Sequence, residues 1–154
     1  MRVALGAFAL TLALTAPGYG VDKYSWDFVK SGQEVQLSYG IPESEAVTII
    51  FRCKAKRIEI ISTVLPRKPK KGPARTTLSN GAATAVHDGK FGYSKGEEGG
   101  FYFEASALVE PKVVAILKSG TTLTIRTPGK EERVPLRGVA APLAKFEAAC
   151  FRSR

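Results

Sequence analysis

Hydrophobic and polar residues alternate along much of this chain. Residues 24–28 and 35–39 place aromatic or aliphatic side chains at every second position, which is typical of strands with one buried face. The aromatic side chains Tyr24, Trp26 and Phe28 are therefore expected to form a core face rather than a carbohydrate-binding platform. The nearly continuous apolar run 46–54 predicts a central strand covered on both faces. The run 58–65 follows after only a short polar break and predicts its hairpin partner.

Turn residues divide the middle of the chain into further short strands. Glycine next to asparagine or aspartate tolerates the positive φ values that tight turns require. The expected turns are Asn80-Gly81, Asp88-Gly89, 97–100 and Pro128-Gly129. The strands around them are expected at 76–79, 82–87, 90–94, 101–107, 121–127 and 131–137.

Two segments carry helix signals instead. Residues 110–118 begin with Pro111 in the first turn and end at Ser119-Gly120, a favourable C-terminal cap. Residues 139–151 are rich in alanine, with apolar side chains at helical spacing. The sequence thus predicts a mainly β fold: an antiparallel β-sandwich or flattened barrel with one short helix and a C-terminal helix.

The first residues do not fit this pattern. Arg2 precedes an uninterrupted apolar run over residues 3–16, which is followed by Pro-Gly. This pattern is typical of a secretory signal peptide, and the run is shorter than the roughly 20 residues of a transmembrane helix. We expect residues 1–20 to be a signal peptide cleaved after Gly18 or Gly20. The alternative is an apolar helix retained in the fold.

Residues 21–154 are then expected to form a single exported domain, periplasmic or secreted, without a transmembrane anchor after processing. Loss of Arg2 changes the formal net charge from +9 to +8. A positive surplus favours acidic partners through long-range attraction. Outside the cytoplasm such partners are anionic envelope components or acidic proteins rather than nucleic acid. The alternative is that the surplus serves only solubility.

The chain has two cysteines, Cys53 and Cys150. In an oxidising compartment we expect them to form a structural disulfide that joins the terminal helix to strand 46–54. A loop of this size is worth about 4.7 kcal/mol in the chain-entropy model. The alternatives are two buried free thiols or a redox pair, although a redox pair usually has Cys-x-x-Cys spacing, which is absent.

Catalytic and metal-binding signatures are missing. His87, the only histidine, is followed by Asp88 at an expected turn, where a histidine is usually exposed, and no Gly-x-Ser-x-Gly nucleophile motif occurs. The carboxylates lack EF-hand spacing, and no glycine-rich phosphate cradle follows a strand. These scattered carboxylates are Asp22, Asp27, Glu97, Glu98, Glu131 and Glu132. Glu43 and Glu45 could serve as an acid/base pair, but exposed carboxylates in a turn are usually only solvated. We therefore expect a protein that is not an enzyme and uses no metal or cofactor.

Segment 66–75 is the strongest candidate binding site. It combines three prolines with five cations, and it is expected to form an extended, solvated loop. The cations are Arg67, Lys68, Lys70, Lys71 and Arg75. Each basic residue near an anionic membrane surface is worth about 1 kcal/mol, so an anion- or partner-binding role is expected. The alternative is a solvated loop that protects neighbouring strands from aggregation.

Short motifs at both ends of the expected domain carry a resemblance. They are Ser-Tyr-Gly-Ile-Pro-Glu-Ser at 38–44, Phe-Arg-Cys at 51–53, Leu-Arg-Gly-Val at 136–139 and Phe-Glu-Ala-Ala-Cys at 146–150. Together they resemble uncharacterised exported proteins of Gram-negative bacteria. They are also similar to accessory periplasmic proteins of type VI secretion and, more faintly, to invasion-associated-locus-B proteins. The resemblance implies a periplasmic β-rich domain without known catalytic residues, and the basic segment has no counterpart in it.

These observations favour a non-enzymatic envelope protein that binds an anionic ligand or acidic partner through the basic segment. The alternative is an accessory structural component of a secretion or invasion system that acts through apolar strand edges. A third hypothesis is a hydrolase with an unrecognised site around His87.

Overall fold

The computed structural model describes residues 23–54, 57–95, 99–108 and 111–151. The expected signal peptide, Asp22, Glu97 and Glu98 lie outside the described residues. No described helix is both long enough and apolar enough to cross a membrane.

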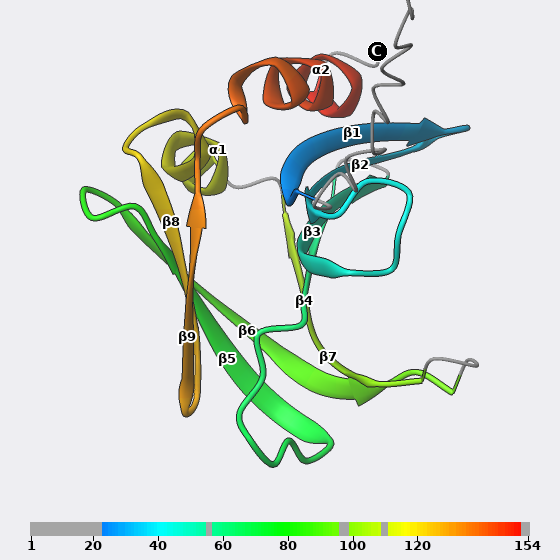
Figure 1. Cartoon of the computed structure of the whole chain (residues 1–154), viewed down its shortest axis with the longest axis vertical. Helices are drawn as coiled ribbons and strands as arrows, with labels where there is room; N and C mark the ends of the chain where they lie inside the picture. The colour runs from blue at the N-terminus through cyan, green and yellow to red at the C-terminus, as the bar shows by residue number, and fades with distance from the viewer. Residues whose placement is uncertain (1–22, 55–56, 96–98, 109–110, 152–154) are drawn as a thin grey trace, which may run out of the picture.

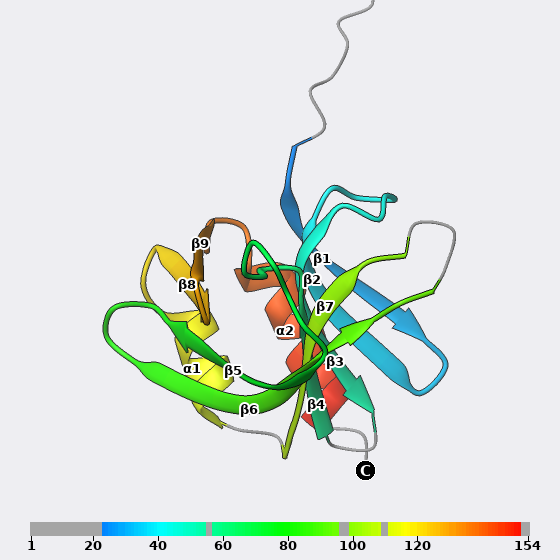
Figure 2. The ribbon, with the colours of Figure 1, turned by 90° about the horizontal axis from the view of Figure 1, so that it is seen from below.

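Within these described ranges, nine strands form one antiparallel sheet in the order β1-β2-β3-β4-β7-β6-β5-β8-β9. The strands are β1 (Ser25–Ser31), β2 (Glu34–Gly40), β3 (Val47–Lys54), β4 (Arg57–Ser62), β5 (Gly72–Ser79), β6 (Thr84–Tyr93), β7 (Phe101–Leu108), β8 (Thr122–Thr127) and β9 (Lys130–Pro135). The sheet curls into a half-barrel, and the helices α1 (Pro111–Lys118) and α2 (Ala140–Phe151) lie against its inner face (Figures 1 and 2). The predicted mainly β fold with two helices is confirmed, and its strands belong to a single curled sheet rather than to two stacked sheets.

The alternating pattern explains which face of the sheet is buried. Leu37, Ile49 and Phe51 are fully buried on the inner face, whereas Ile50 between them is only half-buried on the outer face. The expectation that strand 46–54 is covered on both faces is therefore wrong. Its outer face remains open because both helices pack on the inner side.

Trp26 links the first and the last strand of the sheet. Its side chain is only 6% exposed, and its Nε1 donates a hydrogen bond of 2.8 Å to the carbonyl oxygen of Pro135 at the end of β9. The bond joins the two outermost strands of the same sheet, which do not pair with each other. Trp26 is thus a core residue, as predicted, and Phe28 packs against the same core while partly buried. The predicted core face does not include Tyr24, which is 47% exposed.

The predicted disulfide is also confirmed. Cys53 in β3 and Cys150 in α2 are bonded, with their Cα atoms 5.8 Å apart, and both side chains are buried. The bond encloses a sequence separation of 97 residues. It therefore fixes α2 covalently on the inner face of the sheet.

The β5–β6 hairpin is confirmed, although its turn is longer than two residues. Ser79 pairs with Thr84, and the connection between them is fixed by the side chain of Asn80. Its Oδ1 accepts a hydrogen bond of 2.8 Å from the amide of Ala83, and its Nδ2 donates one of 2.9 Å to the carbonyl oxygen of Ser119. Asn80 therefore both closes the hairpin and caps the end of α1.

The expected turn at Asp88-Gly89 is wrong, because β6 continues through both residues. Gly89 lies so close to β7 that a Cβ atom there would come within 2.8 Å of the Phe103 ring. The glycine thus permits a close approach of two strands rather than a turn. As a consequence His87 lies inside a strand and is 4% exposed, which overturns its expected surface position.

The expected loop at 66–75 is shorter than predicted, because β5 already begins at Gly72. Proline is tolerated in a strand that has no partner on the side of its missing N–H group. β5 pairs with β8 only over Thr77–Ser79, so Pro73 lies where the described strand has a neighbour on one side.

Candidate functional site

The connection from β4 to β5 carries most of the predicted binding site. β7 and β6 lie between these two strands in the sheet, so residues 63–71 must cross three strand spacings, about 14 Å. The crossing follows the inner side of the sheet, because Leu65 packs against Phe91 and Phe103 there. We call residues 66–71 the basic loop. It is a crossing connection and not the tip of a hairpin (Figure 2).

The start of this connection is firmly anchored. The Thr63 hydroxyl donates a hydrogen bond of 2.7 Å to the carbonyl oxygen of Val47. The Thr127 hydroxyl donates one of 2.9 Å to the carbonyl oxygen of Val64, whose side chain is buried in the core. Since the other end of the connection continues directly into β5, the basic loop is held at both ends.

Four of the five predicted cations lie on this loop, and all four are exposed. They are Arg67, Lys68, Lys70 and Lys71. None of the ion pairs within the described part of the chain involves any of them. Their positive charges are therefore not compensated by neighbouring carboxylates there.

Arg75, the fifth predicted cation, is separated from the others. Thr76 and Leu78 are buried on the inner face of β5, so Arg75 points to the outer face. Its Nε donates a hydrogen bond of 2.7 Å to Oδ1 of Asp88, and this bond lowers the pKa of the Asp88 carboxyl. The charge of Arg75 is thus balanced on the opposite side of the sheet from Leu65.

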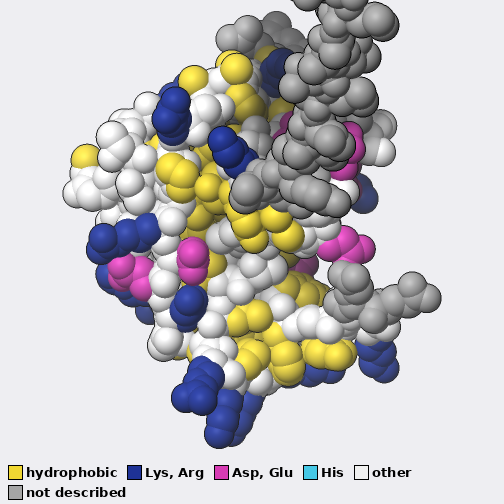
Figure 3. Space-filling model, viewed as in Figure 1, with side chains coloured by type: hydrophobic (Ala, Val, Ile, Leu, Met, Phe, Trp, Pro, Cys, Tyr) yellow, Lys and Arg dark blue, Asp and Glu magenta, His cyan; other side chains and the backbone are white. Residues whose placement is uncertain are grey.

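Aromatic side chains next to the basic loop were not included in the predicted site. The Tyr93 and Phe101 rings, which we call the aromatic pair, meet edge to face with 5.1 Å between their centroids. Tyr93 is 43% exposed, and the Nζ atom of Lys71 lies 5.7 Å from the centroid of its ring. Lys and Arg side chains project beside hydrophobic side chains at the lower end of the molecule (Figure 3). The sequence predicts a strand at 101–107, but the contact of this strand's Phe101 with Tyr93, and of Tyr93 with the loop, depends on the strand order.

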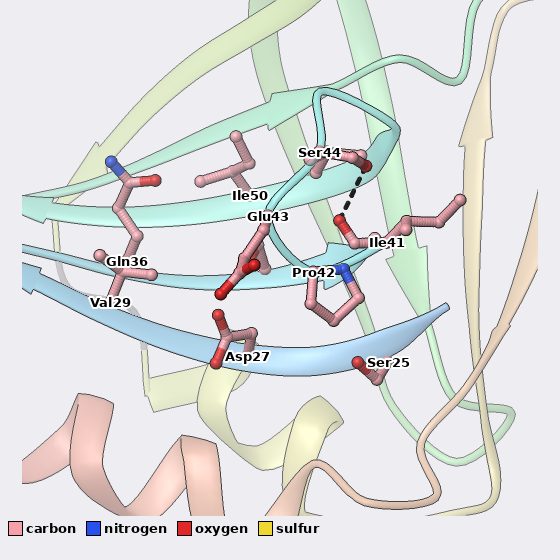
Figure 4. A pocket seen from close by; sticks show the side chains of 12 residues that line it. Ser25, Asp27, Val29, Gln36, Ile41, Pro42, Glu43, Ser44 and Ile50 are labelled. Carbon is pink, nitrogen blue, oxygen red and sulfur yellow. Dashed lines mark hydrogen bonds between the residues drawn. The ribbon is translucent and has the colours of Figure 1, made fainter. Parts of the chain in front are cut away.

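A second polar site lies on the outer face of β1, β2 and β3. It is a pocket of 190 Å³ in which the carboxylates of Asp27 and Glu43 point towards each other (Figure 4). Glu43 has a φ of 59°, and Ser44 donates a hydrogen bond of 2.9 Å to the carbonyl oxygen of Ile41 in the same turn. The predicted neighbour Glu45 does not line this pocket. Within the described ranges no three His, Cys, Asp or Glu side chains are grouped so that they could hold a metal ion.

His87 and Asp88 are not arranged as a catalytic pair. Successive residues of a strand point to opposite faces, so the buried imidazole of His87 faces inward and the Asp88 carboxylate faces outward. His87 stands opposite Thr76 of β5, another buried residue. The strand geometry therefore gives no support to a hydrolase site built on these two neighbours.

Comparisons of the chain with protein-family models, with curated proteins and with solved structures find no match. The resemblance to exported proteins of Gram-negative bacteria thus remains a prediction.

Proposed function

We propose that this protein is a non-enzymatic, exported envelope protein that binds an anionic ligand or acidic partner through the basic loop. One observation carries the proposal. Four exposed cations without carboxylate partners among the described residues are held on a connection that is anchored at both ends.

The basic loop is preorganised, so it loses little backbone conformational entropy when it binds a ligand. Pro66 and Pro69 restrict the backbone, and the hydrogen bond from Thr127 to Val64 fixes the approach to it. Preorganisation of this kind lowers the ordering cost of binding. The attraction between exposed charges is screened by salt, so binding should weaken as ionic strength rises.

Export is the second part of the proposal. Disulfides persist in oxidising compartments and are rare in the cytosol, and the Cys53–Cys150 bond supports such a location. Together with the apolar N-terminal run of the sequence, it supports a periplasmic or secreted protein.

Contact through strand edges, the alternative function, has weaker support. The edge strand β9 carries charged side chains that pair within the strand, with Lys130 bonded to Glu132 and Arg133 bonded to Glu131. Charged residues of this kind are how proteins prevent further strand pairing at a sheet edge.

The proposal can be tested with inorganic polyphosphate as a soluble polyanion, by titration calorimetry at several salt concentrations. The triple variant Lys68→Glu, Lys70→Glu, Lys71→Glu should lose binding, while its thermal unfolding should stay near that of the unmodified protein. The control variant Lys30→Glu, Lys112→Glu, Lys145→Glu changes the net charge equally at exposed lysines elsewhere and should retain most of the binding.

Equal binding by both triple variants would show that net charge rather than the loop drives association. Binding that does not respond to salt would also contradict the proposal.

A further inference from the structure

The exposed aromatic pair beside the basic loop calls for an explanation beyond anion binding. Tyr93 and Phe101 lie at the paired ends of β6 and β7, on the inner face of the sheet, where neither helix covers them. The ring of Tyr102 lies on the other face of the same hairpin, because a Cβ at Gly92 would come within 2.6 Å of it. This hairpin end therefore presents aromatic rings on both of its faces.

The aromatic rings and the cations belong to one surface. Lys71 Nζ lies over the Tyr93 ring at 5.7 Å from its centroid, and Lys68 and Lys70 are exposed in the same loop. Figure 3 shows Lys and Arg side chains next to the hydrophobic group at this end of the molecule. A flat surface that carries negative charge outside and an apolar interior could satisfy both kinds of side chain at once.

We propose that this end of the half-barrel docks on an anionic lipid membrane, with the cations on the headgroups and the Tyr93 ring in the interfacial layer. The inference rests on the proposed function and specifies its ligand. Tyrosine is enriched at membrane–water interfaces, and basic residues add electrostatic attraction to anionic lipids. Neither contribution alone anchors a protein strongly, whereas the two together give stable but reversible binding.

Vesicle co-sedimentation provides the test, with phosphatidylglycerol–phosphatidylcholine vesicles compared with pure phosphatidylcholine. The unmodified protein should bind only the anionic vesicles. Neutralising Lys68, Lys70 and Lys71 to glutamine should lower the partition coefficient about a hundredfold. Tyr93→Ser should lower it roughly tenfold, because the ring no longer leaves water. The control Tyr24→Ser removes a ring of similar exposure, 47%, and should change little.

Depth of insertion gives an independent readout. In Tyr93→Trp the new indole should be quenched by brominated lipids in anionic vesicles. Trp26 is buried and its hydrogen bond to Pro135 holds it in the core, so the unmodified protein supplies the unquenched background.

Two outcomes would overturn the membrane inference. One is an unquenched Tyr93→Trp variant, and the other is a Tyr93→Ser variant that binds vesicles as the unmodified protein does. If polyphosphate binding persists in either case, the proposed anion-binding function stands without the membrane. If the folded, disulfide-bonded, unmodified protein binds neither polyphosphate nor anionic vesicles, both proposals are wrong.

Discussion

The two ends of the half-barrel use the same inner sheet face in different ways. At one end α2 covers the sheet, and Ile49, Phe51 and Phe146 are fully buried in the main core. At the other end an extended loop replaces the helix, and a small separate cluster forms around Phe91 and Phe103. Figure 1 shows both helices at the first end, whereas no described helix lies over the ends of β5, β6 and β7 at the second.

The difference shows that the element packed on an apolar sheet face, a helix or a loop, determines whether that face contributes stability or remains available for binding. A helix removes aliphatic side chains from water over its whole length, so the covered end supplies stability. A loop rich in proline and lysine covers only part of the face beneath it, and Tyr93 remains 43% exposed. The covered end is thus expected to control stability, and the open end is expected to control binding.

Removal of the disulfide should have the largest effect on this comparison. Cys53→Ser with Cys150→Ser should lower the free energy of unfolding by about 4 kcal/mol, because the unfolded chain regains the freedom of a long loop. Urea unfolding measures the loss. Reductant should destabilise the unmodified protein similarly and leave the double variant unchanged.

The same double variant also tests whether polyphosphate binding at the open end is independent of the stability of the covered end. Under conditions where it remains folded, its affinity for polyphosphate should match that of the unmodified protein. A parallel loss of stability and affinity would show that the open end depends on α2.

Gly89→Ala should disturb the open end with a smaller cost. The added methyl group would clash with the backbone carbonyl oxygen of Glu104 and would also meet the Phe103 ring, so we expect a loss of about 3 kcal/mol. Urea unfolding measures it. Gly32→Ala is a useful comparison, because apart from its chain neighbours nothing lies within 4 Å of its Cβ position. Any stability that this variant loses comes from backbone strain at a φ of 58° and not from a steric clash. A Gly89→Ala variant as stable as the unmodified protein would contradict the close packing of β6 against β7.

The smallest effect concerns the Arg75–Asp88 ion pair on the outer face. The pair lowers the pKa of Asp88, so its contribution to stability is present above the ordinary carboxyl pKa and is lost as pH falls through the lowered value. The stability difference between the unmodified protein and Arg75→Gln should therefore shrink from neutral to strongly acidic pH. Thermal unfolding across this pH range measures it.

Arg75→Gln also sharpens the assignment of the binding site. Because Arg75 lies on the outer face and is already paired, the variant should bind polyphosphate nearly as well as the unmodified protein. A loss as large as that of the loop triple variant would place Arg75 back in the site.

The sequence predicts the chemistry of the candidate site, an exposed group of cations, but not which residues lie together in it. Proline and lysine in one segment indicate an exposed basic loop wherever that segment lies. The separation of Arg75 from Lys71, and the contact of Lys71 with Tyr93, depend on which strands are neighbours. The facing carboxylates of Asp27 and Glu43 have the same origin, since they come from β1 and from the β2–β3 connection.

The sequence by itself determined the features that arise from local periodicity and from residue chemistry. Alternation specified strands such as β2, alanine and apolar spacing specified α2, and the presence of only two cysteines specified the disulfide partner of Cys53. Tertiary structure alone decided the strand order, the inward position of His87 and the need for glycine at position 89. The physical reason is that a period of two residues defines the faces of a strand, whereas its neighbours are selected by packing between residues far apart in the chain.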